Sequence, residues 1–131
     1  MGKKYTTFKV NLEGLNDKAR WYTIVTQYNY EQKVANDISK MIKDDSLNSS
    51  IEDVFCGIKE EQVATTNRKG EVVIKTKNEK IMANYVFVKT KMDAHIWSVL
   101  TNITGVSAIL CTAGIPVFTS EKKMEEIRNM L

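Results

Sequence analysis

The stretch KIMANYVFVK, residues 80–89, is the most apolar run in this chain, and a lysine stands at each end of it. β-Branched and aromatic residues dominate it without a glycine or proline, which predicts a strand over residues 82–88. Side chains alternate between the two faces of a strand. One face would carry Met82, Asn84, Val86 and Val88, and the other Ala83, Tyr85, Phe87 and Lys89. The valines suit a core. The aromatic face then needs its own cover, either a helix of this chain or a partner outside it.

The composition is typical of one globular domain. The chain has 131 residues, of which 43% are hydrophobic and 27% charged, which is enough for a real core. No apolar run approaches the roughly 20 residues of a membrane helix, and no signal-peptide pattern follows the first residues. Two cysteines without a disulfide framework favour reduced thiols. We therefore expect a cytoplasmic protein without membrane association.

Basic residues concentrate in the middle of the chain. Residues 65–91 hold seven Lys or Arg against two Glu, although the whole chain carries a net charge of only +3. Such a segment predicts a surface that faces nucleic acid. The simpler alternative is a hairpin kept soluble by exposed lysines. The candidate nucleic-acid patch consists of Arg68, Lys69, Lys75, Lys77 and Lys80.

The apolar periodicity predicts the order β-α-β-β-β-α-β-α. Strands are expected at 21–28, 51–64, 71–77, 82–88 and 106–111, with a turn at 67–70 that makes a hairpin. Helices are expected at 29–44 with Asn29 as N-cap, at 93–101 with Asp93 as N-cap, and after Ser120, where Met124, Ile127 and Leu131 form the apolar face. This order predicts an α+β fold in which a largely antiparallel four-stranded sheet is flanked by about three helices and extended by the hairpin. Residues 1–20 are expected to form a partly ordered N-terminal arm, with an edge strand at 5–10.

The sequence gives little support for catalysis. His95, Cys56 and Cys111 lack the spacing of a metal site, and there is neither a glycine-rich phosphate loop nor a nucleophile elbow. A dyad of His95 with either cysteine is the least favoured interpretation, because nothing nearby activates a thiol. We expect no enzyme, no metal and no cofactor.

Two stretches resemble the N-terminal domain of the NusG family. WYTIV at 21–25 and YEQKV at 30–34 resemble its first strand and helix. Residues 80–89 resemble its Phe-Pro-Gly-Tyr strand, in the Asn-Tyr-apolar-Phe-Val form of the RfaH paralogues. Asp93 and Trp97, the segment NITGV at 102–106 and Pro116 follow as landmarks in the family's order. The resemblance covers about residues 21–131, and its specificity comes from the order and spacing of the motifs.

The resemblance implies a non-enzymatic transcription elongation factor domain that modulates processivity, pausing and termination. In the family, an apolar cavity docks the β′ clamp helices of RNA polymerase, and the other side of the cleft is reached through the β gate loop. Bridging the cleft favours the closed clamp by linkage. Upstream or non-template DNA would be a further partner, and a monomer is expected. The KOW domain that follows in the family, and binds Rho or a ribosomal protein, is absent from this chain, so neither contact is expected.

By position, the resemblance places the clamp-helix site at Tyr85, Phe87, Met82, Ile81 and Val25. It places the gate-loop side at His95 and Ser98, and contacts to non-template or upstream DNA at Asn102, Thr101 and Thr104. Ile103 replaces a threonine of the members that pause at specific sequences, which argues against such pausing. Ala83-Asn84 stands where the family has Pro-Gly, and predicts a less kinked entry into the strand.

Other interpretations of the same residues stay open. Tyr85 and Phe87 are equally compatible with packing under a helix, and Asn102 with simply ending one. A different function class is a free-standing nucleic-acid-binding module, in which the basic hairpin contacts phosphates while Tyr85 and Phe87 stack on bases.

Overall fold

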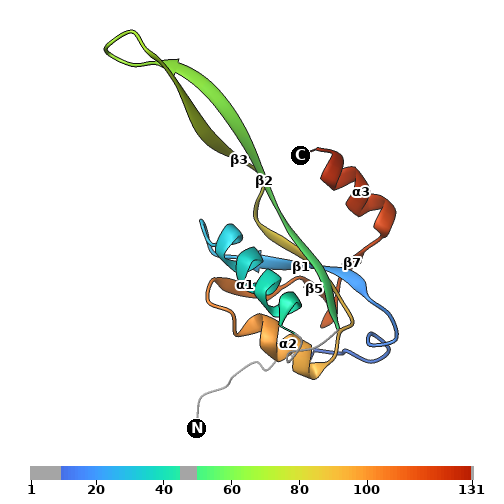
Figure 1. The fold of residues 1–131 in the computed structure, drawn as a ribbon. Coiled ribbons are helices and arrows are strands. Elements are labelled where there is room, and N and C mark those ends of the chain that lie inside the picture. The colour runs from blue at the N-terminus through green and yellow to red at the C-terminus, as the bar shows by residue number, and fades with distance from the viewer. Residues whose placement is uncertain (1–9, 45–49, 131) are drawn as a thin grey trace.

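An antiparallel sheet forms the body of the protein, and two of its strands continue into a long hairpin that projects away from the helices (Figure 1). The computed structural model describes residues 10–44 and 50–130, and within these the side chains of 58–61 and 76–81 are not described. The main sheet has the order β2-β3-β1-β4, with β7 paired to β1. Its strands are β1 Arg20–Thr26, β2 Ile51–Thr66, β3 Val72–Thr90, β4 Val106–Ile109 and β7 Phe118–Thr119, and the short strands β5 Cys111–Thr112 and β6 Ile115–Pro116 pair separately. The predicted α+β fold is confirmed.

Three helices cover the two faces of this sheet. They are α1 Glu31–Lys43, α2 Ala94–Thr101 and α3 Glu121–Asn129. The predicted N-caps of the last two are confirmed, because Asp93 Oδ1 accepts from Ile96 N at 2.8 Å and Ser120 Oγ accepts from Lys123 N at 3.2 Å. The predicted cap of the first helix is wrong: Tyr30 occupies the N-cap position. Asn29 instead takes a turn conformation with φ of +68°.

The main core lies between the sheet and the first two helices. Ile24, Val86 and Val88 are fully buried from the strands, and Val34, Ile38 and Leu100 from the helices. Each such side chain contributes about 1.5–3 kcal/mol by leaving water. The opposite face holds a second, smaller core in which Met124 and Ile127 of α3 cover Trp21 and Phe87. The last predicted member of the α3 face, Leu131, lies outside the described residues.

Strand β3 is a single element where two strands were predicted. It runs from residue 72 to 90 because β2 pairs with it along most of that length, including the polar segment 78–80. The register of this pairing shifts at three places, and the largest shift is a bulge at residues 83–85. Cys56 pairs with Val86 while the next residue, Gly57, pairs with Met82, so the bulge has no partner on β2.

The bulge corrects two predictions. Regular alternation put Met82 on the face of Val86, but the extra residues turn Met82 to the other face, where it packs against the cluster of Trp21 and Phe87. The second prediction was a less kinked entry into the strand, because Ala83-Asn84 stands where the family has Pro-Gly. The backbone at this entry is nevertheless kinked. Asn84 has φ of +68°, and asparagine is one of the few residues that adopt this left-handed conformation readily.

The described part of the predicted N-terminal arm packs against the body. Leu15 is buried in the main core, and its carbonyl accepts a hydrogen bond from Met92 N at 3.1 Å. Asn11 N donates to Gly114 O at 2.8 Å. Residues 5–9 of the predicted edge strand lie outside the described residues. Within the described part of the chain, no helix is long and apolar enough to cross a membrane.

Candidate functional site

The two aromatic residues of β3 have different environments. Tyr85 is 37% exposed, whereas Phe87 is 3% exposed. The ring of Phe87 stacks on Phe55 with centroids 5.2 Å apart, and α3 covers it through Met124 and Ile127. The prediction that Phe87 lines an open docking site is therefore wrong, because the chain's own helix occupies that position.

Beside α3, a row of side chains crosses three strands on the same face. Val25 of β1 pairs with Tyr85 of β3 on one side and with Ala108 of β4 on the other. Paired residues share a face of the sheet. The same register puts Leu110 opposite Thr23, and Leu110 N donates to Thr23 O at 2.9 Å. We call Tyr85, Val25, Ala108 and Leu110 the apolar strip. Tyr85, Ala108 and Leu110 are exposed and Val25 is half-buried.

Sequence reasoning found only part of this strip. Tyr85 and Val25 were predicted, but Ala108 and Leu110 were missed. The available signal was alternation, because both residues flank the buried Ile109, the last residue of β4. Of the other predicted members, Met82 is half-buried at the covered end near Phe87, and the side chain of Ile81 is not described.

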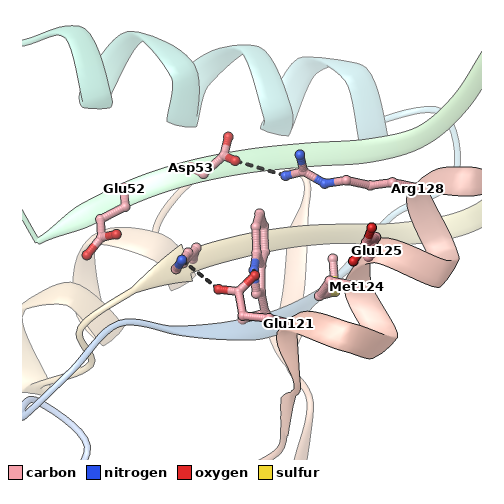
Figure 2. A pocket seen from close by; sticks show the side chains of 8 residues that line it. Glu52, Asp53, Glu121, Met124, Glu125 and Arg128 are labelled. Atoms are coloured by element: carbon pink, nitrogen blue, oxygen red, sulfur yellow. Dashed lines mark hydrogen bonds and ion pairs between the residues drawn. The ribbon is translucent and has the colours of Figure 1, made fainter.

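Helix α3 is attached to the sheet by ionic contacts around a small apolar centre. Lys89 Nζ lies 2.5 Å from Glu121 Oε1, and Trp21 Nε1 donates to Glu121 Oε2 at 3.2 Å. At the other end of the helix, Arg128 forms an ion pair of 2.8 Å with Asp53, as Figure 2 shows. The Arg128 guanidinium also lies 5.1 Å from the Trp21 ring and 4.9 Å from the Phe55 ring.

These contacts surround a cavity of about 450 Å³ between α3 and the sheet. Its rim is mainly acidic, with Glu52, Asp53, Glu121 and Glu125 against Lys89 and Arg128 (Figure 2). Hydrogen bonds from Lys89 and Trp21 lower the pKa of Glu121, and the bond to Glu121 raises the pKa of Lys89. A polar rim of this kind fastens α3 and does not match an apolar ligand.

The residues predicted for the gate loop and for DNA lie together on and after α2. His95 and Ser98 are exposed on this helix, and Asn102 and Thr104 are exposed directly after it. Asn102 Nδ2 donates to Ser98 O at 2.8 Å, and Thr101 Oγ1 donates to Trp97 O at 2.8 Å. Asn102 therefore closes the helix, as the alternative interpretation has it. The functional interpretation of these residues stays a prediction.

The basic residues of the hairpin are partly described. Arg68, Lys69 and Lys75 are exposed, and the side chains of Lys77 and Lys80 are not described. The predicted turn is confirmed: Asn67 Oδ1 accepts hydrogen bonds from Lys69 N at 2.9 Å and Glu71 N at 3.0 Å, and Gly70 has φ of +80°. This turn places the exposed side chains of Arg68 and Lys69 at the end of the hairpin.

The structure describes the environment of both cysteines. Both Cys56 and Cys111 are thiols rather than members of a disulfide. Burial raises the pKa of the Cys111 thiol, which is the opposite of activation. Among the described residues, no group of three His, Cys, Asp or Glu side chains is arranged to hold a metal ion.

Comparison with known proteins now decides the family. A family model described as "Transcription termination factor nusG" matches residues 19–128. This chain belongs to the NusG family. The NusG of Staphylococcus aureus strain N315 is 30% identical over 112 residues, and the NusG of Rickettsia typhi is 26% identical over 116. These alignments cover 86% and 88% of this chain and 59% and 58% of the relatives. Both relatives are described as transcription termination/antitermination proteins.

A NusG structure has the same fold. The solved structure described as "Domain interaction in Thermotoga maritima NusG" superposes with a TM-score of 0.62 at 22% identity, covering 84% of this chain and 55% of that one. The chain thus spans a little under three fifths of the length of the NusG proteins it matches. The NusG match includes both the apolar strip and nearly all of α3.

Proposed function

We propose that this chain is the polymerase-binding domain of a NusG-type elongation factor, acting without catalysis in the cytoplasm. One observation supports this most directly. A domain that matches the NusG model over residues 19–128 exposes an apolar strip across three strands, and two of its members, Tyr85 and Val25, are at positions that the family resemblance assigns to clamp-helix docking. The name of the relatives supports a role in transcription termination and antitermination.

In this proposal the tip of the β′ clamp helices docks on the apolar strip. Tyr85 is its anchor, because a tyrosine buries a large rigid ring at a small entropic cost while its hydroxyl stays hydrogen-bonded. Val25, Ala108 and Leu110 supply the flat apolar surface around it. Phe87 takes no part in contact and instead supports the strip from beneath α3.

The second side of the cleft would be reached through α2. His95 and Ser98 would face the β gate loop, and Thr101, Asn102 and Thr104 would lie toward the non-template or upstream DNA. Docking on both sides stabilises the closed clamp only if the closed state binds the domain more tightly, which is a shift of population by linkage. No chemical step is needed for this effect.

The test measures binding to an isolated β′ clamp-helix fragment. Tyr85→Ala is expected to weaken the affinity by about 10- to 100-fold, the loss typical of an interfacial tyrosine anchor. Tyr28→Ala is the matched control, because Tyr28 is also exposed (69%) but lies outside the strip. Phe87→Ala is unsuitable, since emptying a buried aromatic site costs about 3–5 kcal/mol of stability. Unchanged binding by a folded Tyr85→Ala variant rules the strip out as the docking site.

A free-standing nucleic-acid-binding module is the second candidate. It is favoured by the exposed Arg68, Lys69 and Lys75 on the hairpin. The stacking platform predicted for this function is reduced to Tyr85, because Phe87 is buried. Affinity for free oligonucleotides and its dependence on salt separate this candidate from the first.

A further inference from the structure

A carboxylate of α1 holds the bulge of β3. Glu31 is the first residue of the helix and is only 1% exposed. Its Oε2 accepts a hydrogen bond from the backbone N–H of Asn84 at 2.9 Å. Asn84 Nδ2 in turn donates to the carbonyl of Thr26, at the end of β1, at 3.1 Å. The bulge is therefore bound to α1 through its backbone and to β1 through its side chain.

These bonds replace the ladder bonds that the bulge gives up. Residues 83–85 have no partner on β2, and the pairing of β3 with β1 ends at Tyr85 opposite Val25. A buried backbone N–H needs an acceptor, and for Asn84 the acceptor is Glu31. Hydrogen bonds to a charged acceptor are stronger than those between neutral groups. The left-handed backbone of Asn84 is thus stabilised from outside its own strand.

The bulge also lies between two surfaces that matter for function. Tyr85, its last residue, is the anchor of the apolar strip. Below residue 83, β2 is the only described strand that pairs with β3, so the hairpin leaves the body at this point (Figure 1). Whatever fixes Asn84 therefore fixes both the backbone that presents Tyr85 and the place where the hairpin departs.

We propose that Glu31 is a positioning residue of the docking site: through Asn84 it sets the backbone of Tyr85 and so the geometry of the apolar strip. Glu31 itself is buried and makes no contact with the partner. This inference rests on the proposed docking function, because it assigns a role in the same site. It predicts that affinity depends on an acceptor at residue 31 and on a left-handed backbone at residue 84.

The first experiment compares Glu31→Ala with Glu31→Gln for binding to the clamp-helix fragment. Glu31→Ala is expected to weaken binding by about tenfold, the equivalent of one lost hydrogen bond to a charged group. Glu31→Gln stays within about threefold of wild type, because its amide oxygen can accept the same bond. Ile38→Val is the stability control, since it trims a buried residue of the same helix far from the bulge and leaves affinity unchanged.

Amide hydrogen exchange of the free protein gives a readout that general destabilisation would not produce. In Glu31→Ala the Asn84 amide is expected to exchange at least about tenfold faster, while the amide of Ile24 in the core keeps its protection. Ile38→Val changes the exchange of the two amides in parallel.

A second pair of variants, at residue 84, covers the case in which Glu31→Ala fails to fold. Asn84→Gly keeps the left-handed backbone and near wild-type affinity, whereas Asn84→Val, which disfavours that conformation, loses about tenfold.

The outcomes separate the two proposals. If Tyr85→Ala weakens binding but Glu31→Ala and Asn84→Val do not, the positioning role is wrong and the docking site stands. If Glu31→Gln loses as much affinity as Glu31→Ala, the hydrogen bond to Asn84 is not the cause, and the inference fails. If Tyr85→Ala has no effect, the docking site is wrong, and with it the role of Glu31 in docking.

Discussion

Gly57 faces Met82 across the sheet, where the bulge of β3 begins. A Cβ atom at residue 57 would lie 2.6 Å from Met82 Cβ and 2.9 Å from Met82 N. Real Cβ atoms do not approach backbone this closely, so Gly57→Ala has to displace β2 from β3. We expect a loss of about 1–3 kcal/mol in the free energy of unfolding, measured by urea denaturation.

A double variant makes this prediction sharper. Met82→Ala retains both the Cβ and the backbone nitrogen that a side chain at residue 57 would meet. It should therefore not rescue Gly57→Ala. Gly70→Asn is the control, because nothing lies within 4 Å of that position and asparagine tolerates its φ of +80°. A Gly57→Ala variant as stable as wild type would show that the two strands separate here at no cost.

For the residues of β3, the sequence predicted which valines are buried but not the bulge that breaks the alternation. The buried positions of Val86 and Val88 follow from alternation and are confirmed. The break in alternation could not be read from Asn84 alone, because an asparagine inside an apolar run is compatible with a regular strand. Its partners lie far away in the chain: Glu31, 53 residues before it, accepts from its backbone N–H, and Thr26 accepts from its side chain. In the sequence, Glu31 was noted only as part of the segment YEQKV, which resembles the family's first helix.

Helix α3 shows the same limit for a whole element. Its cap at Ser120 and its apolar residues Met124 and Ile127 were predicted from local spacing. The surface that it covers was not, because Trp21 lies 100 residues before Glu121 in the chain. Only the structure could therefore show whether a helix of this chain covers the aromatic face. In the structure α3 covers Phe87, whereas Tyr85 stays exposed.

The ion pair between Lys89 and Glu121 gives α3 a stability that depends on pH. The pKa of Glu121 is lowered in the folded protein. Its contribution is therefore present above the pKa of the unfolded chain and is lost as the pH falls through the lower, folded value. Because Glu121 is 67% exposed, Glu121→Gln is expected to cost no more than about 1 kcal/mol at neutral pH.

Urea unfolding of the wild type and of Glu121→Gln checks this across the acid range. The difference in unfolding free energy should shrink as the pH falls below about 4, the ordinary range of a glutamate. Glu125→Gln, on the same helix and the same cavity rim, is the control for loss of a negative charge. The pKa of Lys89 is raised, so its share is lost only in strong alkali and does not interfere. A difference that stays constant down to the acid limit contradicts the prediction.

For the molecule as a whole, the apolar strip and the hairpin are separate surfaces. The strip crosses β3, β1 and β4 within the body, whereas the end of the hairpin lies roughly 30 Å from the bulge, given about 3.3 Å per residue over residues 57–66. In the proposal, a protein partner on the body therefore leaves the hairpin accessible to nucleic acid. Each surface should then respond to its own substitutions alone.

The hairpin prediction uses a triple variant, Arg68→Gln with Lys69→Gln and Lys75→Gln. Its affinity for a labelled oligonucleotide should fall, and the slope of log affinity against log salt should decrease by about 2–3, because up to three phosphate contacts are removed. Binding to the clamp-helix fragment should not change.

The matched control is Lys18→Gln with Lys40→Gln and Lys122→Gln, which removes the same charge from exposed positions away from the hairpin. If both triple variants lose affinity equally, net charge and not the hairpin carries the binding. If the wild type binds oligonucleotide tightly at physiological salt and Tyr85→Ala weakens it, the free-standing nucleic-acid module displaces the polymerase-binding proposal.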